Sequence, residues 1–180
     1  MHKDAHIKSA PHCAGFSLVE LMVTLAVLLF LLAVAIPSLI PFVEKTDITA
    51  TSQSLREGLA IARAEAIKRA SLVQVCNLDA EAMQCAGTTK SGRRVWQDGF
   101  MVFDDVDKDA EFSESVDQLL YVAHFSPSLN VDWGRGDYLV YASSGALKFG
   151  NGSFRIQNSE SEQGLKLILN IVGRVRSDEI

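Results

Sequence analysis

The chain has 180 residues, which is enough for one globular domain and an additional segment. Its formal net charge is −5, so the overall charge does not indicate a nucleic-acid-binding protein, and any such binding would need a local basic patch. Glycine and proline account for only 12 and 4 residues, and no repeat or low-complexity tract is present, which excludes extensive disorder.

The first 36 residues join a polar segment to an apolar one. Residues 1–15 are polar and carry Lys3 and Lys8. Residues 16–36 are apolar except at three positions, Ser17, Glu20 and Thr24. About 20 apolar residues span a bilayer as a helix, and lysines hold a short flanking segment on the cytoplasmic side. We therefore predict a membrane-spanning helix.

Two features distinguish this segment from an ordinary secretory signal. Such a signal is cleaved after its apolar core, whereas here Gly15 precedes the core, so the apolar segment would remain on the mature protein. Glu20 lies inside the apolar run, where a carboxylate is costly unless it has a partner. A plain signal anchor would explain the length and the lysines, but not Glu20.

The run GFSLVE at residues 15–20 resembles the class III signal of type IV pilins and type II secretion pseudopilins. The resemblance implies that a prepilin peptidase cuts between Gly15 and Phe16 and that the new amino group of Phe16 is N-methylated. It also implies that Glu20 pairs with the N-terminal amine of a neighbouring filament subunit, which would offset the desolvation of both charges. Pro37 also matches these families, in which a proline often loosens this helix.

Residues 47–70 have the pattern of an amphipathic helix. Apolar side chains recur at helical spacing at Ile48, Leu55, Leu59, Ala62 and Ala66. The helix either starts anew at a cap formed by Thr46 or Asp47, or continues from Phe16 to about Ala70 over roughly 80 Å. In the pilin arrangement, residues 1–15 are a cleaved leader, residues 16–43 a transmembrane and filament-core helix, and residues 44–180 a globular head.

The remainder of the chain indicates short strands separated by turns. The candidate strands are Leu72–Cys76, Arg94–Trp96, Phe100–Phe103, Leu119–Phe125, Tyr138–Ala142, Ser153–Gln157 and Leu165–Val172. Many short strands with tight turns are typical of antiparallel sheet. We therefore predict an α+β fold, in which a long N-terminal helix packs on an antiparallel β-sheet head.

Two of the three cysteines remain after removal of the leader, which contains Cys13. Cys76 and Cys85 have eight residues between them, and a loop of this size closed by a disulfide in an oxidising periplasm is stabilised by about 2–3 kcal/mol. A metal site needs more ligands, and His124 is the only histidine after the apolar segment. We therefore expect a structural disulfide.

The head resembles the FimT/GspH group of minor pilins and minor pseudopilins. The residues that carry the resemblance are the cysteine pair, WQDGFMVFD at residues 96–104, an acidic turn, and GRVR at residues 173–176. The resemblance implies a head with a helix packed on antiparallel sheet. It leaves open whether the chain joins a type IV pilus or a type II secretion system.

The GRVR element leads to the most specific hypothesis, because FimT-like proteins of natural transformation have a GRxR element that contacts DNA. Arg174 and Arg176, after Gly173, would point the same way on an extended segment and reach successive phosphates. If the strand register persists through Gly173, Lys166 shares their face. Binding to double-stranded DNA would then be independent of sequence and sensitive to salt. The alternative is a solvated strand end whose arginines pair with acidic residues 178–179.

An acidic turn follows the candidate strand Phe100–Phe103, with alternating Asp105, Asp107, Asp109 and Glu111. The alternation is similar to the start of a calcium loop. However, Ala110 stands where an EF-hand needs glycine, and Val116 stands where it needs glutamate. The pattern therefore favours a solvated turn and leaves a low-affinity calcium site as the alternative; we predict no metal ligands and no cofactor.

No enzyme motif is present in the sequence: there is no GxSxG, no glycine-rich phosphate loop and no HExxH. We therefore do not expect an enzyme. The chain is either a minor pilin that captures DNA during natural transformation, or a structural minor pilin or pseudopilin that primes or caps a filament. In both cases we expect a bacterial inner-membrane protein with a periplasmic head, processed by prepilin peptidase and assembled with other pilins.

Overall fold

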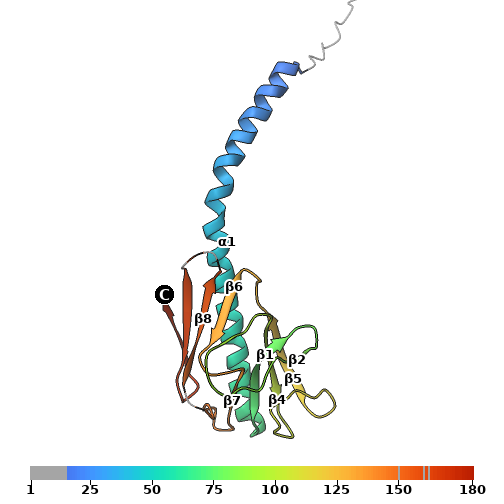
Figure 1. Cartoon of the computed structure of the whole chain (residues 1–180), viewed down its shortest axis with the longest axis vertical. Coiled ribbons are helices and arrows are strands. Elements are labelled where there is room, and N and C mark those ends of the chain that lie inside the picture. Colours follow the sequence, from blue (N-terminus) through green and yellow to red (C-terminus); the bar gives the residue numbers. More distant parts are fainter. Residues whose placement is uncertain (1–15, 150, 160, 162) are drawn as a thin grey trace, which may run out of the picture. The chain divides into compact units, whose positions relative to one another are not determined.

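In a computed structural model, the described part of the chain comprises residues 16–149, 151–159, 161 and 163–180, without the side chains of residues 36–40. Within this part, one helix, α1 (Leu18–Arg69), is followed by ten strands (Figure 1). The chain divides into two compact units, Met1–Pro41 and Phe42–Ile180. The predicted leader, its cleavage site after Gly15 and the side chain of Pro37 lie outside the described residues.

The described residues of the first unit include the apolar N-terminal part of α1. Leu18–Ala35 is long and apolar enough to cross a membrane, as judged by length and composition. The side chains of Phe16 and Glu20 are exposed here. The helix has no break at residues 46–47, so the alternative of a new start at a Thr46 or Asp47 cap is wrong. The Thr46 hydroxyl instead donates to the Phe42 carbonyl at 2.8 Å, a bond of the helix interior.

The strands form two antiparallel sheets. The first contains β1 (Val73–Asp79), β2 (Gln84–Cys85), β4 (Gly99–Asp104), β5 (Gln118–His124) and β7 (Tyr138–Tyr141). In this sheet β1 pairs with both β4 and β7, and its end pairs with β2. The second contains β3 (Arg94–Val95), β6 (Leu129–Trp133), β8 (Gly152–Asn158), β9 (Gly164–Leu169) and β10 (Val175–Glu179). Its order is β10-β9-β8-β6-β3.

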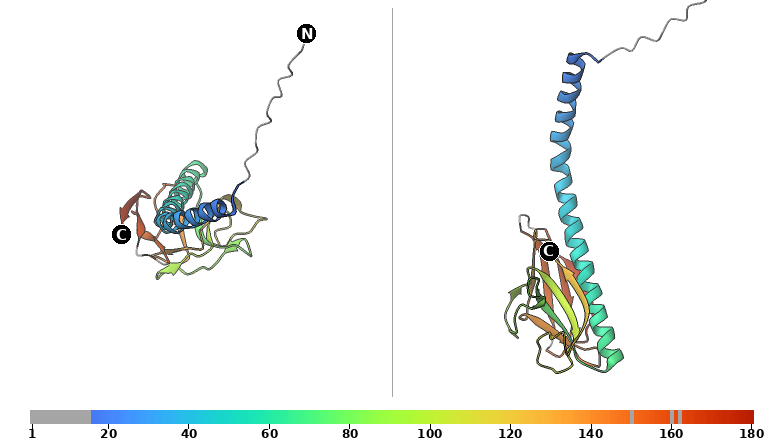
Figure 2. Two further views of the ribbon diagram at one scale, coloured as in Figure 1. Left: turned by 90° about the horizontal axis from the view of Figure 1, so that it is seen from above. Right: turned by 90° about the vertical axis from the view of Figure 1, so that its right-hand side faces the viewer.

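The main core of the second unit lies between α1 and the inner faces of both sheets (Figure 2). Leu55 and Leu59 of the helix are buried against strand residues such as Phe100 and Phe154. At Gly58 the helix approaches the first sheet closely, because a Cβ there would lie 2.3 Å from a ring carbon of Phe100. The prediction of an amphipathic helix is therefore confirmed, since all five apolar positions on which it was based are buried.

A smaller cluster lies on the opposite face of the first sheet. It includes Met101, Phe103 and Cys76, and the disulfide between Cys76 and Cys85 closes beside it, with a Cα–Cα distance of 5.6 Å. Because both faces of β1 and β4 are covered, these strands are buried at nearly every position. This pattern explains why β4 reads as a continuous apolar run rather than as an alternation.

The predicted α+β class is confirmed, but several strand predictions need correction. β2, β6 and β10 were not predicted, and Trp96 follows β3 instead of ending it. β9 ends at Leu169, whereas the predicted strand continued to Val172, because residues 170–173 form a turn. The acidic turn after β4 is also not fully solvated, since the Asp105 side chain is buried.

Candidate nucleic-acid interface

The GRVR element begins in a turn that Asn170 holds closed with three hydrogen bonds. The Asn170 carbonyl accepts the N–H of Gly173 at 2.9 Å, and its side-chain Oδ1 accepts the N–H of Arg174 at 2.9 Å. The N–H of Asn170 donates to the Arg174 carbonyl at 3.1 Å. The carbonyl of Ile171 accepts the N–H of Leu147 at 2.9 Å. These bonds give the backbone of Arg174 a defined position at the start of β10.

Gly173 has a structural function in this turn. Its φ is +79°, in the left-handed region that favours glycine. A Cβ at this position would lie 2.4 Å from the Gly145 carbonyl oxygen and 2.9 Å from the Tyr141 ring. Burial raises the pKa of the Tyr141 hydroxyl, an effect that the charge of Arg63 opposes. Gly173 therefore shapes the turn, and its N–H and carbonyl are already paired with Asn170 and Arg63.

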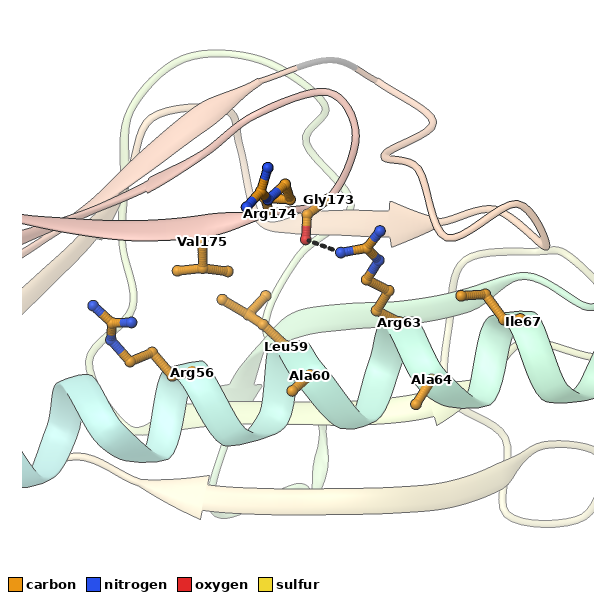
Figure 3. Close-up of a pocket in the computed structure, with 9 residues that line it drawn as sticks. All are labelled: Arg56, Leu59, Ala60, Arg63, Ala64, Ile67, Gly173, Arg174 and Val175. Carbon is orange, nitrogen blue, oxygen red and sulfur yellow. Dashed lines mark hydrogen bonds between the residues drawn. The ribbon is translucent and has the colours of Figure 1, made fainter.

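A groove of about 490 Å³ separates the GRVR element from α1. Figure 3 shows Arg56 and Arg63 rising from α1 toward the C-terminal segment, while Val175 points toward the helix. The guanidinium of Arg63 donates to the Gly173 carbonyl at 3.4 Å. Arg56 and Arg63 are seven residues apart, about 10 Å along the helix axis, and therefore lie on similar faces two turns apart. The groove thus has arginines on both of its sides.

The two arginines of the element differ in their surroundings. Arg174 is exposed at the rim of the groove, and its side chain points away from α1 (Figure 3). Within the described part of the chain its guanidinium has no hydrogen-bond or ion-pair partner. Arg176 is also exposed, and its Nη2 lies 3.9 Å from the Asp178 carboxylate. Such an exposed pair contributes about 0–1 kcal/mol, so both arginines remain accessible to an anion.

The strand register does not persist through Gly173, so the condition on which Lys166 was expected to share a face with the arginines is not met. The chain reverses after β9, and β10 returns antiparallel to it. Lys166 does share a face with Arg176, but its direct cross-strand neighbours are Asp178 on one side and Arg155 on the other. This face of the sheet is therefore of mixed charge, and Lys166 is no simple extension of the arginine pair.

Comparison with known proteins identifies the family. A family model described as type II transport protein GspH matches residues 51–173, and a model of the prokaryotic N-terminal methylation motif matches residues 11–36. The chain belongs to the GspH family. The GspH match ends at Gly173, so Arg174 and Arg176 lie beyond it. None of the curated proteins matches the chain in sequence.

Solved structures show the same fold for this GspH-family chain. The minor pilin FimU of Pseudomonas aeruginosa is similar with a TM-score of 0.54 and 19% identity, over 77% of this chain and 92% of FimU. The minor pseudopilin EpsH of Vibrio cholerae is similar with a TM-score of 0.52 and 14% identity, over 74% of this chain and 97% of EpsH. The predicted pilin fold and FimT/GspH-type family are therefore confirmed.

Three residues of this GspH-family protein that line or hold the candidate interface, Arg56, Arg63 and Asn170, were not predicted as site residues from the sequence. Arg56 and Arg63 belong to the predicted amphipathic helix, and Asn170 lies inside the predicted strand Leu165–Val172. Their spacing held a partial signal, since Arg56 and Arg63 recur at seven residues, and an asparagine three residues before a glycine is typical of a turn. The sequence alone does not show that the chain returns in β10 to lie beside α1.

Proposed function

We propose that this GspH-family protein is a minor pilin that binds double-stranded DNA without sequence specificity and acts in DNA uptake during natural transformation. The observation that supports the proposal is the pair of exposed arginines, Arg174 and Arg176, held by a hydrogen-bonded turn beside a groove with Arg56 and Arg63 on its other side. We infer a role in binding and assembly, without enzymatic activity.

The chemistry of the interface suits a phosphate backbone. A guanidinium binds phosphate through two parallel N–H groups and stays charged at any physiological pH. Arg174, Arg176 and Arg56 have charged groups that are available for such contacts, whereas Arg63 also serves the Gly173 carbonyl. Contacts to phosphates carry no sequence information. One head with about three contacts binds weakly, and several heads in one filament gain by avidity.

A purely structural role is the second candidate. It is supported by the description of the matching family as a type II transport protein, by the likeness to EpsH and by the net charge of −5. In this role Glu20 would pair with the N-terminal amine of Phe16 in a neighbouring subunit. For either role we propose processing by prepilin peptidase after Gly15 and an inner-membrane location with a periplasmic head.

The test is DNA binding by the full-length protein in detergent micelles. Fluorescence anisotropy with two unrelated duplexes of about 30 base pairs would compare wild type with the Arg174→Gln/Arg176→Gln double variant. With about three phosphate contacts, raising salt from 50 to 200 mM should lower the affinity about 40-fold. The double variant should lose about two-thirds of the salt slope and bind at least about tenfold more weakly at 50 mM.

The matched control is Lys90→Gln/Lys108→Gln, which removes the same charge at two exposed positions outside the groove. We expect this control to bind DNA as wild type does, within about twofold. If wild type does not bind at 50 mM salt, or if both double variants lose affinity equally, the arginines do not form a DNA site. The structural role would then be the better account of this chain.

A further inference from the structure

We propose that Asp105, Asp107 and Asp109, in the turn after β4, form a binding site for a calcium ion. Each of the three side chains offers a carboxylate oxygen, and these oxygens lie within 4.8 Å of one another. Three carboxylates so close together repel one another, and a hard divalent cation with oxygen ligands relieves that repulsion. The proposal is independent of DNA binding, because it concerns none of the arginines.

The buried member of the group, Asp105, points to a ligand. Only 4% of this residue is exposed, and its Oδ1 is buried without a hydrogen-bond partner among the described residues. Burial raises the pKa of the Asp105 carboxyl, with further contributions from the negative charges of Asp117 and Asp109, while the N–H groups of Lys108 and Ala110 oppose the shift. A buried carboxylate oxygen with no partner is expensive, and a bound cation would satisfy it.

The surrounding turn is tied to the sheet and holds the carboxylates in place. The side-chain amide of Gln74 in β1 donates to the Ala110 carbonyl at 2.6 Å. The Asp117 carboxylate accepts the N–H groups of Val106 and Ser113 at 3.0 and 2.8 Å, which closes the turn from its far end. One oxygen of Asp109 accepts the N–H of Glu111 at 2.8 Å, which orients that carboxylate. Asp107 and Asp109 are exposed, so an ion has a route to the site.

Ala110, which argues against a calcium loop in the sequence, does not argue against one in the structure. In an EF-hand the sixth loop position is glycine because of the sharp turn there. Counted from Asp105, this position is Ala110, whose φ is +71°, so alanine here adopts the left-handed conformation that glycine usually provides. Val116 still lacks the bidentate carboxylate of the twelfth position. We therefore assign a weak site, of the strength found in extracellular modules, with a Kd of about 10⁻⁴ to 10⁻³ M.

The experiment uses full-length protein in detergent micelles, stripped of metal with a chelator and titrated with CaCl₂ in a calorimeter. We expect saturable binding in the range given, and a higher Tm in 5 mM CaCl₂ than in NaCl of equal ionic strength. Asp107→Asn, at an exposed position, should weaken calcium binding at least about tenfold. The matched control is Glu114→Gln, which removes one exposed acidic charge from the same turn and should change the Kd less than about threefold.

Magnesium provides the test of ion type. It requires near-ideal octahedral geometry and loses its water reluctantly, so we expect it to bind this irregular turn at least about fivefold more weakly than calcium. Three results would overturn the proposal: no heat and no rise in Tm with calcium, equal losses in Asp107→Asn and Glu114→Gln, or an equal rise in Tm with NaCl. Equal or tighter magnesium binding would overturn the assignment to calcium.

Discussion

Replacement of Gly173 by alanine isolates the contribution of the turn that presents the arginines. Any L-residue pays about 1–2 kcal/mol for a left-handed backbone, and Gly173 has φ +79°. The new Cβ would in addition meet the Gly145 carbonyl oxygen at 2.4 Å, and overpacking of this kind costs about 1–3 kcal/mol. We therefore expect Gly173→Ala to lower the free energy of unfolding by about 2–5 kcal/mol.

Gly92 provides a matched control for this substitution. Its φ is +81°, but a Cβ there would meet nothing within 4 Å. Gly92→Ala therefore has the same conformational cost, about 1–2 kcal/mol, without the steric one. The gain from restricting the unfolded chain is the same for both variants and cancels in their difference.

The assay is urea unfolding of the full-length protein in a mild detergent, followed by tryptophan fluorescence. Trp96 and Trp133 are the only tryptophans of the chain, and both are buried in the second unit, so the signal reports that unit. If Gly173→Ala loses no more stability than Gly92→Ala, the turn adjusts freely to a side chain. The close approach of Gly173 to Gly145 would then not hold the arginines in place.

Two further predictions concern the stability of the head. The Cys76→Ala/Cys85→Ala variant should have a free energy of unfolding about 2–3 kcal/mol lower than that of wild type, because the disulfide closes a short loop. An unchanged urea midpoint would contradict that reasoning. Leu59→Ala should lower the free energy of unfolding by about 2–5 kcal/mol, because Leu59 is only 1% exposed. Ile67→Ala on the same helix, at 51% exposure, should lower it by less than about 1 kcal/mol. Similar losses of stability in the two variants would place Leu59 outside the core.

The elements with a regular spacing of apolar residues were predictable from the sequence. Those in which turn-forming or polar residues interrupt or replace that spacing were not. The helix around Leu55 and Leu59 follows from spacing alone. β6 also alternates, with Leu129, Val131 and Trp133 buried, but the turn-forming Asn130 and Asp132 between them concealed the strand. β10 is an exposed edge strand rich in polar residues, so no apolar pattern marks it. Its existence depends on pairing with β9, which is a property of the fold.

The candidate interface was predictable in its two C-terminal arginines, but not in its other residues or its geometry. The sequence motif pointed to Arg174 and Arg176, and the cysteine spacing pointed to the disulfide. The relation of Arg174 to Arg56 and Arg63 joins segments more than 100 residues apart, which no local pattern encodes. Lys166 illustrates the same limit, because a turn of four residues reverses the chain and brings Asp178 opposite the lysine.

The strength of the Arg176–Asp178 contact bears on the choice between the two proposed functions. An ion pair at 3.9 Å between side chains that are 72% and 52% exposed contributes little, so a phosphate can replace Asp178 at small cost. Arg174 has its backbone fixed by Asn170, so only its side chain must be ordered on binding. The acidic character of the whole chain weakens long-range attraction to DNA, but this effect is screened at physiological salt beyond about 8 Å. The salt slope, which counts phosphate contacts, therefore discriminates between the two functions better than the affinity of one head does.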